Sequence, residues 1–259
     1  MSDRRGVEAQ DRQAEAAPAE VPGRLLCVGD IHGCVDELER LLDLVAPGEQ
    51  DRLVFLGDYI DRGPASASVV EVLLEVEKHL PGTVFLRGNH EDMLLDFLGL
   101  DGSHGDSFLW NGGDRTVASY GIDVARGPVL PGRVAAALPP EHLRFFRSAL
   151  HLWYRAGRFT FVHAGVRPGR PIAEQDRSDL LWIRDEFLRH DHGLPTTIVF
   201  GHTPQREVLL DVPRKIGLDT GAVYGGKLSC LDLTNFVLHQ VERRSRRTER
   251  KVLRVADAF

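Results

Sequence analysis

Residues 25–33 read LLCVGDIHG, four apolar residues followed by Gly-Asp and, two positions later, a histidine. A short apolar run that ends in turn residues is typical of a buried strand. The same pattern recurs at residues 53–58 (LVFLGD) and 83–90 (TVFLRGNH). The two segments between these runs carry apolar residues at helical spacing. Strands alternating with helices at intervals of about 30 residues predict βαβ units and a parallel sheet.

The second half of the chain follows a different pattern. Residues 99–150 are mostly helical in pattern with a turn-rich middle, which predicts a helical cap or insertion. Short strand-like runs follow at residues 159–163, 197–201, 215–218, 228–233 and 236–241. Because no long helix separates the last of them, we expect a second, more antiparallel sheet. The predicted fold class is α/β, a β-sandwich of two mixed sheets flanked by helices.

The ends of the chain differ from its centre. Residues 1–22 have no hydrophobic period and predict a disordered N-terminal tail. Residues 243–259 begin with RRSRRTERK and predict a basic C-terminal tail. A chain of 259 residues is long enough for one large domain, which we expect to span residues 23–242.

Composition excludes several classes of function. No stretch approaches the roughly 20 apolar residues that span a bilayer, so no membrane association is expected. The formal net charge of −6 gives no reason to expect nucleic acid as a partner. The N-terminus has no apolar run of a secretory signal, and Cys27, Cys34 and Cys230 form no CxxC pair. These features favour a cytoplasmic protein with reduced thiols.

Polar residues that commonly bind metals follow five of the predicted strands. A single histidine in such a place is usually structural, but coincidence at five strand ends is not expected by chance. Ligand sites of open α/β sheets lie beyond the carboxyl ends of the strands, so these side chains should converge. Oxygen and imidazole donors suit Mn, Fe or Zn, and clustered carboxylates repel one another unless cations lie between them. The residues are Asp30, His32, Asp58, Asn89, His90, His163 and His202.

These residues lie in five blocks: GDIHG (29–33), GDYIDRG (57–63), GNHE (88–91), HAG (163–165) and GHT (201–203). In sequence and order the blocks resemble the signature of the phosphoprotein phosphatase family of metallophosphoesterases. Calcineurin and bacteriophage lambda phosphatase belong to that family. HAGVRPG (163–169) and DTGAVYGG (219–226) are closest to its bacterial and phage lambda-like branch. The resemblance implies a calcineurin-like β-sandwich.

The resemblance also implies a dinuclear centre of two divalent metal ions, with Mn²⁺ expected first and Fe or Zn as alternatives. Such a centre hydrolyses phosphate esters by direct attack of a water or hydroxide that bridges the metals. Asp30 and His32 would hold the first ion, Asp58 would bridge both, and the second ion would be held by Asn89, His163 and His202.

Further roles follow from the same resemblance. Arg62 and Arg184 match arginines that bind the substrate phosphate, a task suited to the planar guanidinium. His90 matches the acid that protonates the leaving group, and Asp61 would orient its ring and keep it protonated. Tyr224 lies in a loop over the active site, where it would contact the substrate or simply pack within the loop.

The first functional hypothesis is a serine/threonine protein phosphatase, with phosphotyrosine activity also possible, acting on a phosphoprotein or small phosphoester. The alternative is a bis(5′-nucleosyl)-tetraphosphatase of the symmetrical type. Asp61 favours the first, because symmetrical dinucleotide hydrolases tend to have another residue there. A nucleic-acid end phosphatase would use the basic tail. An inactive binding scaffold is disfavoured, because every expected ligand position is filled.

Overall fold

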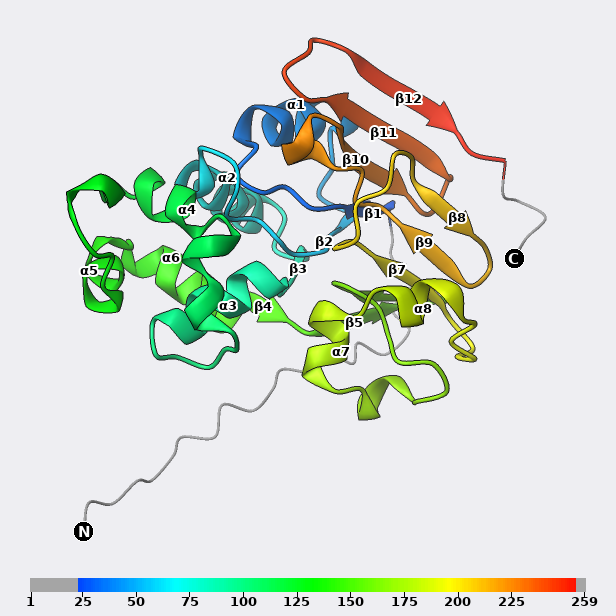
Figure 1. Cartoon of the computed structure of the whole chain (residues 1–259). Coiled ribbons are helices and arrows are strands. Elements are labelled where there is room, and N and C mark those ends of the chain that lie inside the picture. Colours follow the sequence, from blue (N-terminus) through cyan, green and yellow to red (C-terminus); the bar gives the residue numbers. More distant parts are fainter. Residues whose placement is uncertain (1–22, 255–259) are drawn as a thin grey trace.

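A computed structural model describes residues 23–254, which form two facing sheets with helices outside them (Figure 1). The larger sheet has seven strands, of which β1, β2, β3 and β4 run parallel and the remaining three join antiparallel beside β1. In sheet order the strands are β12 (Thr248–Val252), β11 (Val237–Glu242), β10 (Lys227–Asp232), β1 (Leu25–Val28), β2 (Arg52–Phe55), β3 (Val84–Leu86) and β4 (Leu150–His151).

The smaller sheet has five strands. Its three central strands run parallel, and each edge strand is antiparallel to its neighbour. In sheet order they are β5 (Trp153–Ala156), β6 (Phe159–Val162), β7 (Thr197–Phe200), β9 (Lys215–Gly217) and β8 (Leu209–Asp211). Both sheets are therefore mixed, and the predicted α/β fold class is confirmed.

Alternation along the strands explains the layers. On β1, Leu26 packs with the helices, whereas its neighbour Cys27 packs into the space between the two sheets. Helices α1 (Val35–Val45) and α2 (Ser66–His79) are the predicted crossovers of the parallel strands and cover the outer face of the larger sheet. Helices α7 (Arg177–Trp182) and α8 (Asp185–Arg189) cover the smaller sheet. The result is a four-layer sandwich.

Between the two sheets in sequence lies a segment of short helices. Figure 1 shows α3 (Asn89–Phe97) and α4 to α6 gathered at one end of the molecule, beyond β4. The short helices of the segment are η1 (Gly105–Ser107), η2 (Leu109–Asn111), α4 (Gly113–Ser119), η3 (Val124–Arg126), α5 (Pro131–Ala137), α6 (Pro140–Arg144) and the π-turn η4 (Phe145–Ala149). Two single turns, η5 (Ile172–Glu174) and η6 (Ala222–Tyr224), lie in later loops.

The sequence assigned two strands to the wrong sheet. β10 and β11 were expected in the second sheet, but β10 pairs antiparallel with β1, with Leu26 opposite Asp232. The strand pattern alone does not show which of the two sheets a hairpin joins, because an apolar run can pair with the edge strand of either sheet. β4, β5 and β8 were not predicted, and each is only two to four residues long.

The C-terminal prediction was also wrong over part of its length. Residues 248–252 do not leave the domain as a tail but pair with β11 as edge strand β12. Every residue of β12 is exposed, and charged side chains on an edge strand oppose pairing with other molecules. A charged edge strand therefore has the composition of a solvated tail. The predicted N-terminal tail, residues 1–22, lies outside the described residues.

Among residues 23–254, no helix is long and apolar enough to cross a membrane.

An ion pair fixes the turn before β12 to helix α1. Arg243 pairs with Glu37, whose side chain is only 3% exposed and also accepts the backbone N–H of Arg244 at 3.1 Å. Replacing Arg243 by alanine leaves a buried carboxylate without its cation, and we expect a loss of about 3 kcal/mol in the free energy of unfolding. Urea denaturation measures it. Arg246→Ala, at an exposed position of the same turn, is the control, and an equal effect of both changes would contradict this role.

Candidate metal centre

The predicted ligands come together at the carboxyl ends of β1, β2, β3, β6 and β7. All six are at least 96% buried. Two clusters of potential ligand atoms share Asp58, which was predicted as the bridge. One consists of Asp58, His163 and His202, and the other of His32, Asp58 and His90.

The second predicted site is compact. The Asn89 side-chain oxygen lies 3.0 Å from His163 Nε2 and 2.9 Å from His202 Nδ1, so two rings converge on one oxygen. His163 Nε2 also lies 3.4 Å from a carboxylate oxygen of Asp58. The other nitrogen of His163 contacts the carbonyl oxygen of Leu56 at 2.8 Å, which fixes the ring orientation. The four predicted side chains thus share one small volume.

Only one of the two residues of the first predicted site belongs to a cluster. His32 lies 3.5 Å from Asp58, and its Nδ1 is held by the carbonyl oxygen of Ile60 at 2.8 Å. Asp30 joins neither cluster, and its carboxylate accepts the backbone N–H of His202 at 3.0 Å and 3.2 Å. His90, predicted only as an acid, is the third member of the His32 cluster.

The chemistry of these residues fits divalent cations. The donor set is carboxylate, amide and imidazole, with no thiolate, which suits Mn, Fe or Zn. Burial, followed by the charges of Asp219 and Asp58, raises the pKa of Asp30 well above its usual range. Cations would remove this repulsion. His202 Nε2 is buried without a hydrogen-bond partner, as expected of a nitrogen placed for a ligand.

Backbone strain concentrates at the same loops. Among the described residues, nine that are not glycine have positive φ, and five of them belong to the predicted site. Such conformations cost of order 1–3 kcal/mol each and persist where surrounding structure enforces them. The five are His32, Asp58, Asp61, Arg62 and His202. The loops are therefore shaped to place side chains rather than for local stability.

Two glycines allow these loops to approach one another. A Cβ on Gly63 would overlap the carbonyl oxygen of His32, and a Cβ on Gly88 would overlap the side chain of Asp58. Neither neighbour can withdraw, because one is backbone and the other is the shared ligand. Only glycine fits at both positions.

Glu91 is a functional residue for which the sequence analysis gave no role. Its buried carboxylate accepts the backbone N–H groups of Asp58, Tyr59 and Gly88 at 2.8–3.0 Å, and that of Ile60 at 3.3 Å. One side chain thereby fixes the loop that carries the shared ligand to the start of α3. The GNHE block contains the signal, since Glu at the third position of a helix often bonds backbone N–H groups before it.

Asp219 is a second buried carboxylate to which the sequence motifs assigned no role. It is 5% exposed, and burial raises its pKa to about 6. Its charge acts on Asp30, so it adds to the negative potential of the site.

Asp61 and His90 form the predicted pair. His90 Nδ1 lies 2.6 Å from Asp61 Oδ2, and Thr116 donates to the other oxygen of Asp61 at 2.5 Å. Burial raises the pKa of Asp61 and lowers the pKa of His90 to about 4, so both shifts favour the uncharged forms. His90 Nε2 is buried without a hydrogen-bond partner. Asp61 is placed to orient the His90 ring, and its effect on the protonation of the ring stays a prediction.

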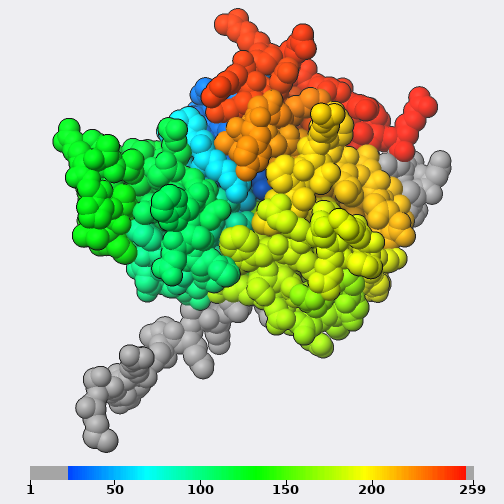
Figure 2. All heavy atoms as spheres, viewed as in Figure 1, coloured from blue at the N-terminus to red at the C-terminus, as the bar shows by residue number. Residues whose placement is uncertain are grey.

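The predicted phosphate-binding side chains lie at the rim. An Arg62 nitrogen lies 2.5 Å from His32 Nε2, and its guanidinium carbon lies 5.6 Å from the ring centre of Tyr224. Arg184 is exposed, and its charge adds to the effect of burial in lowering the pKa values of His90 and His202. In Figure 2 the segments around these residues, from cyan through yellow-green to orange, meet in the middle of one face.

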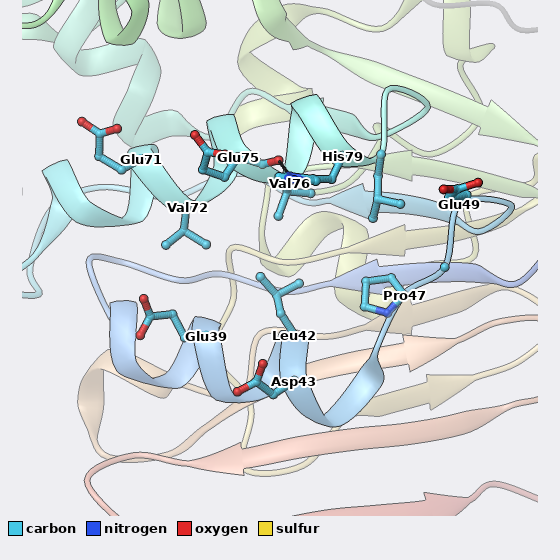
Figure 3. A pocket seen from close by; sticks show the side chains of 12 residues that line it. Glu39, Leu42, Asp43, Pro47, Glu49, Glu71, Val72, Glu75, Val76 and His79 are labelled. Atoms are coloured by element: carbon cyan, nitrogen blue, oxygen red, sulfur yellow. Dashed lines mark hydrogen bonds between the residues drawn. The ribbon is translucent and has the colours of Figure 1, made fainter.

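A separate groove of about 640 Å³ lies between α1 and α2 (Figure 3). Its floor includes Leu42, Val72 and Val76, and its rim is acidic, with Glu39 and Glu71 on opposite helices. None of the predicted ligands or catalytic side chains lines it, so the groove is distinct from the metal centre.

Fold and site together define a metal-dependent phosphoesterase. The family model for calcineurin-like phosphoesterases matches residues 23–227, and the chain belongs to this family, whose members use a dinuclear site for divalent metals. The closer resemblance to the phage lambda-like branch stays a prediction.

Two similar proteins are both named as tetraphosphatases. The bis(5′-nucleosyl)-tetraphosphatase PrpE [asymmetrical] of Bacillus cereus strain AH187 is 30% identical over 79% of this chain and 88% of its own length. The crystal structure of a putative diadenosine tetraphosphatase superposes with a TM-score of 0.64 at 27% identity, covering 86% of this chain and 95% of the other.

A phosphatase of another specificity shares the fold. The cold-active protein-tyrosine phosphatase of a Shewanella species has a TM-score of 0.55 at 20% identity, covering 88% of this chain and 80% of its own. At this identity the likeness concerns the fold alone.

Loss of the shared ligand tests the dinuclear arrangement. Because Asp58 belongs to both clusters, Asp58→Ala should abolish binding of both divalent ions and reduce phosphoester hydrolysis to background. Calorimetric titration with Mn²⁺ and elemental analysis measure the metal. Asp219→Asn, which changes a nearby carboxylate outside both clusters, should retain two ions. Retention of both ions by Asp58→Ala would contradict the shared ligand.

Proposed function

We propose that this protein hydrolyses dinucleoside polyphosphates, cleaving bis(5′-nucleosyl) tetraphosphates asymmetrically into a nucleoside triphosphate and a monophosphate. The observation that carries the proposal is the position of Arg62. Its guanidinium contacts the predicted ligand His32 and lies 5.6 Å from the ring of Tyr224, which is 62% exposed. A phosphate held by Arg62 would thus lie between the metal ligands and an exposed aromatic surface. The relatives named as tetraphosphatases support this substrate class.

The residues divide the chemistry as follows. When bound, two divalent cations, which we propose to be Mn²⁺ with Fe or Zn as alternatives, supply a nucleophilic water at neutral pH and neutralise phosphate charge. Arg62 and Arg184 would hold non-bridging phosphate oxygens through the fork of the guanidinium. His90 would donate its Nε2 hydrogen to the departing oxygen, with Asp61 orienting the ring. The ions would be held by Asp30, His32, Asp58, Asn89, His163 and His202.

The asymmetrical cleavage proposed here differs from the alternative predicted from the sequence, which was a bis(5′-nucleosyl)-tetraphosphatase of the symmetrical type. The PrpE relatives are named asymmetrical, and this chain has Asp61, which the symmetrical hydrolases tend to lack. Both observations support asymmetrical cleavage.

Serine/threonine protein phosphatase activity is the second candidate. The specific observation in its favour is the Asp61–His90 pair, joined at 2.6 Å. An alkoxide leaving group needs a proton far more than a nucleotide phosphate does, so a well-formed acid suits a serine ester.

Product analysis tests the first proposal. Diadenosine tetraphosphate should give ATP and AMP in equal amounts, with a kcat/KM at least about tenfold above that for phosphoserine and phosphothreonine peptides. Anion-exchange chromatography separates the nucleotides. Two molecules of ADP would instead support symmetrical cleavage, and faster turnover of phosphopeptides would favour the second candidate.

The role of His90 is tested by varying the leaving group. His90→Asn should slow hydrolysis of a phosphoserine peptide by about 10²–10⁴-fold, the usual contribution of a general acid. It should slow p-nitrophenyl phosphate and diadenosine tetraphosphate much less, because their leaving groups are weakly basic. Steady-state kinetics at matched metal occupancy measure the difference. Equal losses on all substrates would show that His90 positions the phosphate or a metal instead.

A further inference from the structure

Two aromatic side chains are exposed on the part of the surface that residues 23–254 form. Trp110 is 92% exposed and Tyr224 is 62% exposed, whereas the other Trp, Tyr and Phe side chains in that range are buried or half-buried. An indole left almost wholly in water gives up most of the stabilisation that its burial would provide. Trp110 therefore contributes little to folding.

The backbone that carries Trp110 is well fixed. Phe108 is completely buried, and its carbonyl oxygen accepts the N–H of Gly113 at 3.1 Å, which closes the turn around η2. The side chain of Asn111 donates to the carbonyl oxygen of Ser107 at 2.8 Å. The indole thus projects from an ordered turn, and its main chain needs little rearrangement to meet a ligand.

This turn is joined directly to the phosphate-binding loop. The carbonyl oxygen of Gly112 accepts the N–H of Arg62 at 3.1 Å, and a Cβ on Gly112 would lie 2.6 Å from that nitrogen. Trp110 lies two residues before Gly112, so at most about 7 Å separates their Cα atoms. Tyr224 therefore neighbours Arg62 through its ring, and the turn that carries Trp110 neighbours Arg62 through its backbone.

We propose that Trp110 is a stacking subsite for a nucleobase of the substrate, placed beside the phosphate held at Arg62. The inference rests on the proposed function, since it explains how that site would recognise a nucleotide. A ribose separates base from phosphate, so a base-binding group must lie next to the phosphate site and outside it. Every base offers a π face, and an exposed indole stacks on it with little dependence on which base it is. Tyr224 lies against Arg62 and holds its guanidinium.

Binding of ligands with and without a base tests this subsite. The probes are a methylene-bridged, non-hydrolysable analogue of diadenosine tetraphosphate and a methylene-bridged triphosphate without nucleoside. Calorimetry on the metal-loaded protein gives both Kd values. Trp110→Ala should weaken the dinucleotide analogue at least about tenfold more than the base-free ligand, the range expected for one stacked base. Trp110→Phe should restore most of the affinity.

Leu130→Ala is the matched control, because Leu130 is an exposed apolar residue (58%) elsewhere among the short helices. It should leave both Kd values unchanged. Equal weakening of the two ligands by Trp110→Ala, or none, overturns the subsite even if the protein hydrolyses dinucleotides. A loss of affinity for the dinucleotide analogue alone confirms the subsite even if phosphopeptides are the faster substrates. The stacking subsite and the proposed hydrolytic activity can therefore fail independently of each other. If Trp110 instead docked phosphopeptides, Trp110→Ala would leave the Kd values of both probes unchanged, which would also overturn the inference.

Discussion

The carboxylate of Glu91 is the interaction on which the rest of the site depends. It accepts backbone N–H groups on both sides of the junction between the loop after β2 and the start of α3. Asp58 has a positive φ in that loop, a conformation that costs of order 1–3 kcal/mol. Burial raises the pKa of Glu91 to about 8, so the ordinary contribution of about 0.5–1.5 kcal/mol applies to each of its hydrogen bonds. Together the four bonds are enough to offset that strain. Because Asn89 opens α3, the same carboxylate positions ligands from both loops.

Burial gives the site its electrostatic character. It raises the pKa of Asp30 and of Asp61 and lowers that of His90 and of His202. Neutral imidazoles are the form in which histidines bind divalent cations. A carboxyl group must lose its proton to bind a cation, so the raised pKa of Asp30 makes metal binding at this residue dependent on pH.

The sequence predicted the parallel strands and the clustering of the candidate ligands beyond them, because apolar runs that end in Gly-Asp or Asn-His indicate both a buried strand and the end where polar side chains gather. It could not predict that β10 and β11 join the larger sheet, since strand periodicity does not specify an edge. β12 was missed because an exposed, charged edge strand has the composition of a solvated tail. The signal for Glu91 was present in the GNHE block, at the third position of the helix, but it does not show that the side chain also reaches the loop after β2. Trp110 was missed because its exposure is a property of the folded chain.

The central claim is that Glu91 holds the metal loops in a shape that they would not keep alone. Titration of the metal-free Glu91→Gln variant with Mn²⁺ tests this most directly. Glutamine keeps the size of the side chain but replaces one acceptor oxygen by an NH₂ group, which cannot accept the backbone N–H groups on that side. The account predicts a folded protein whose affinity for Mn²⁺ is weaker by about 10- to 100-fold, as for other groups that support metal ligands. Wild-type affinity for two ions in this variant would contradict it.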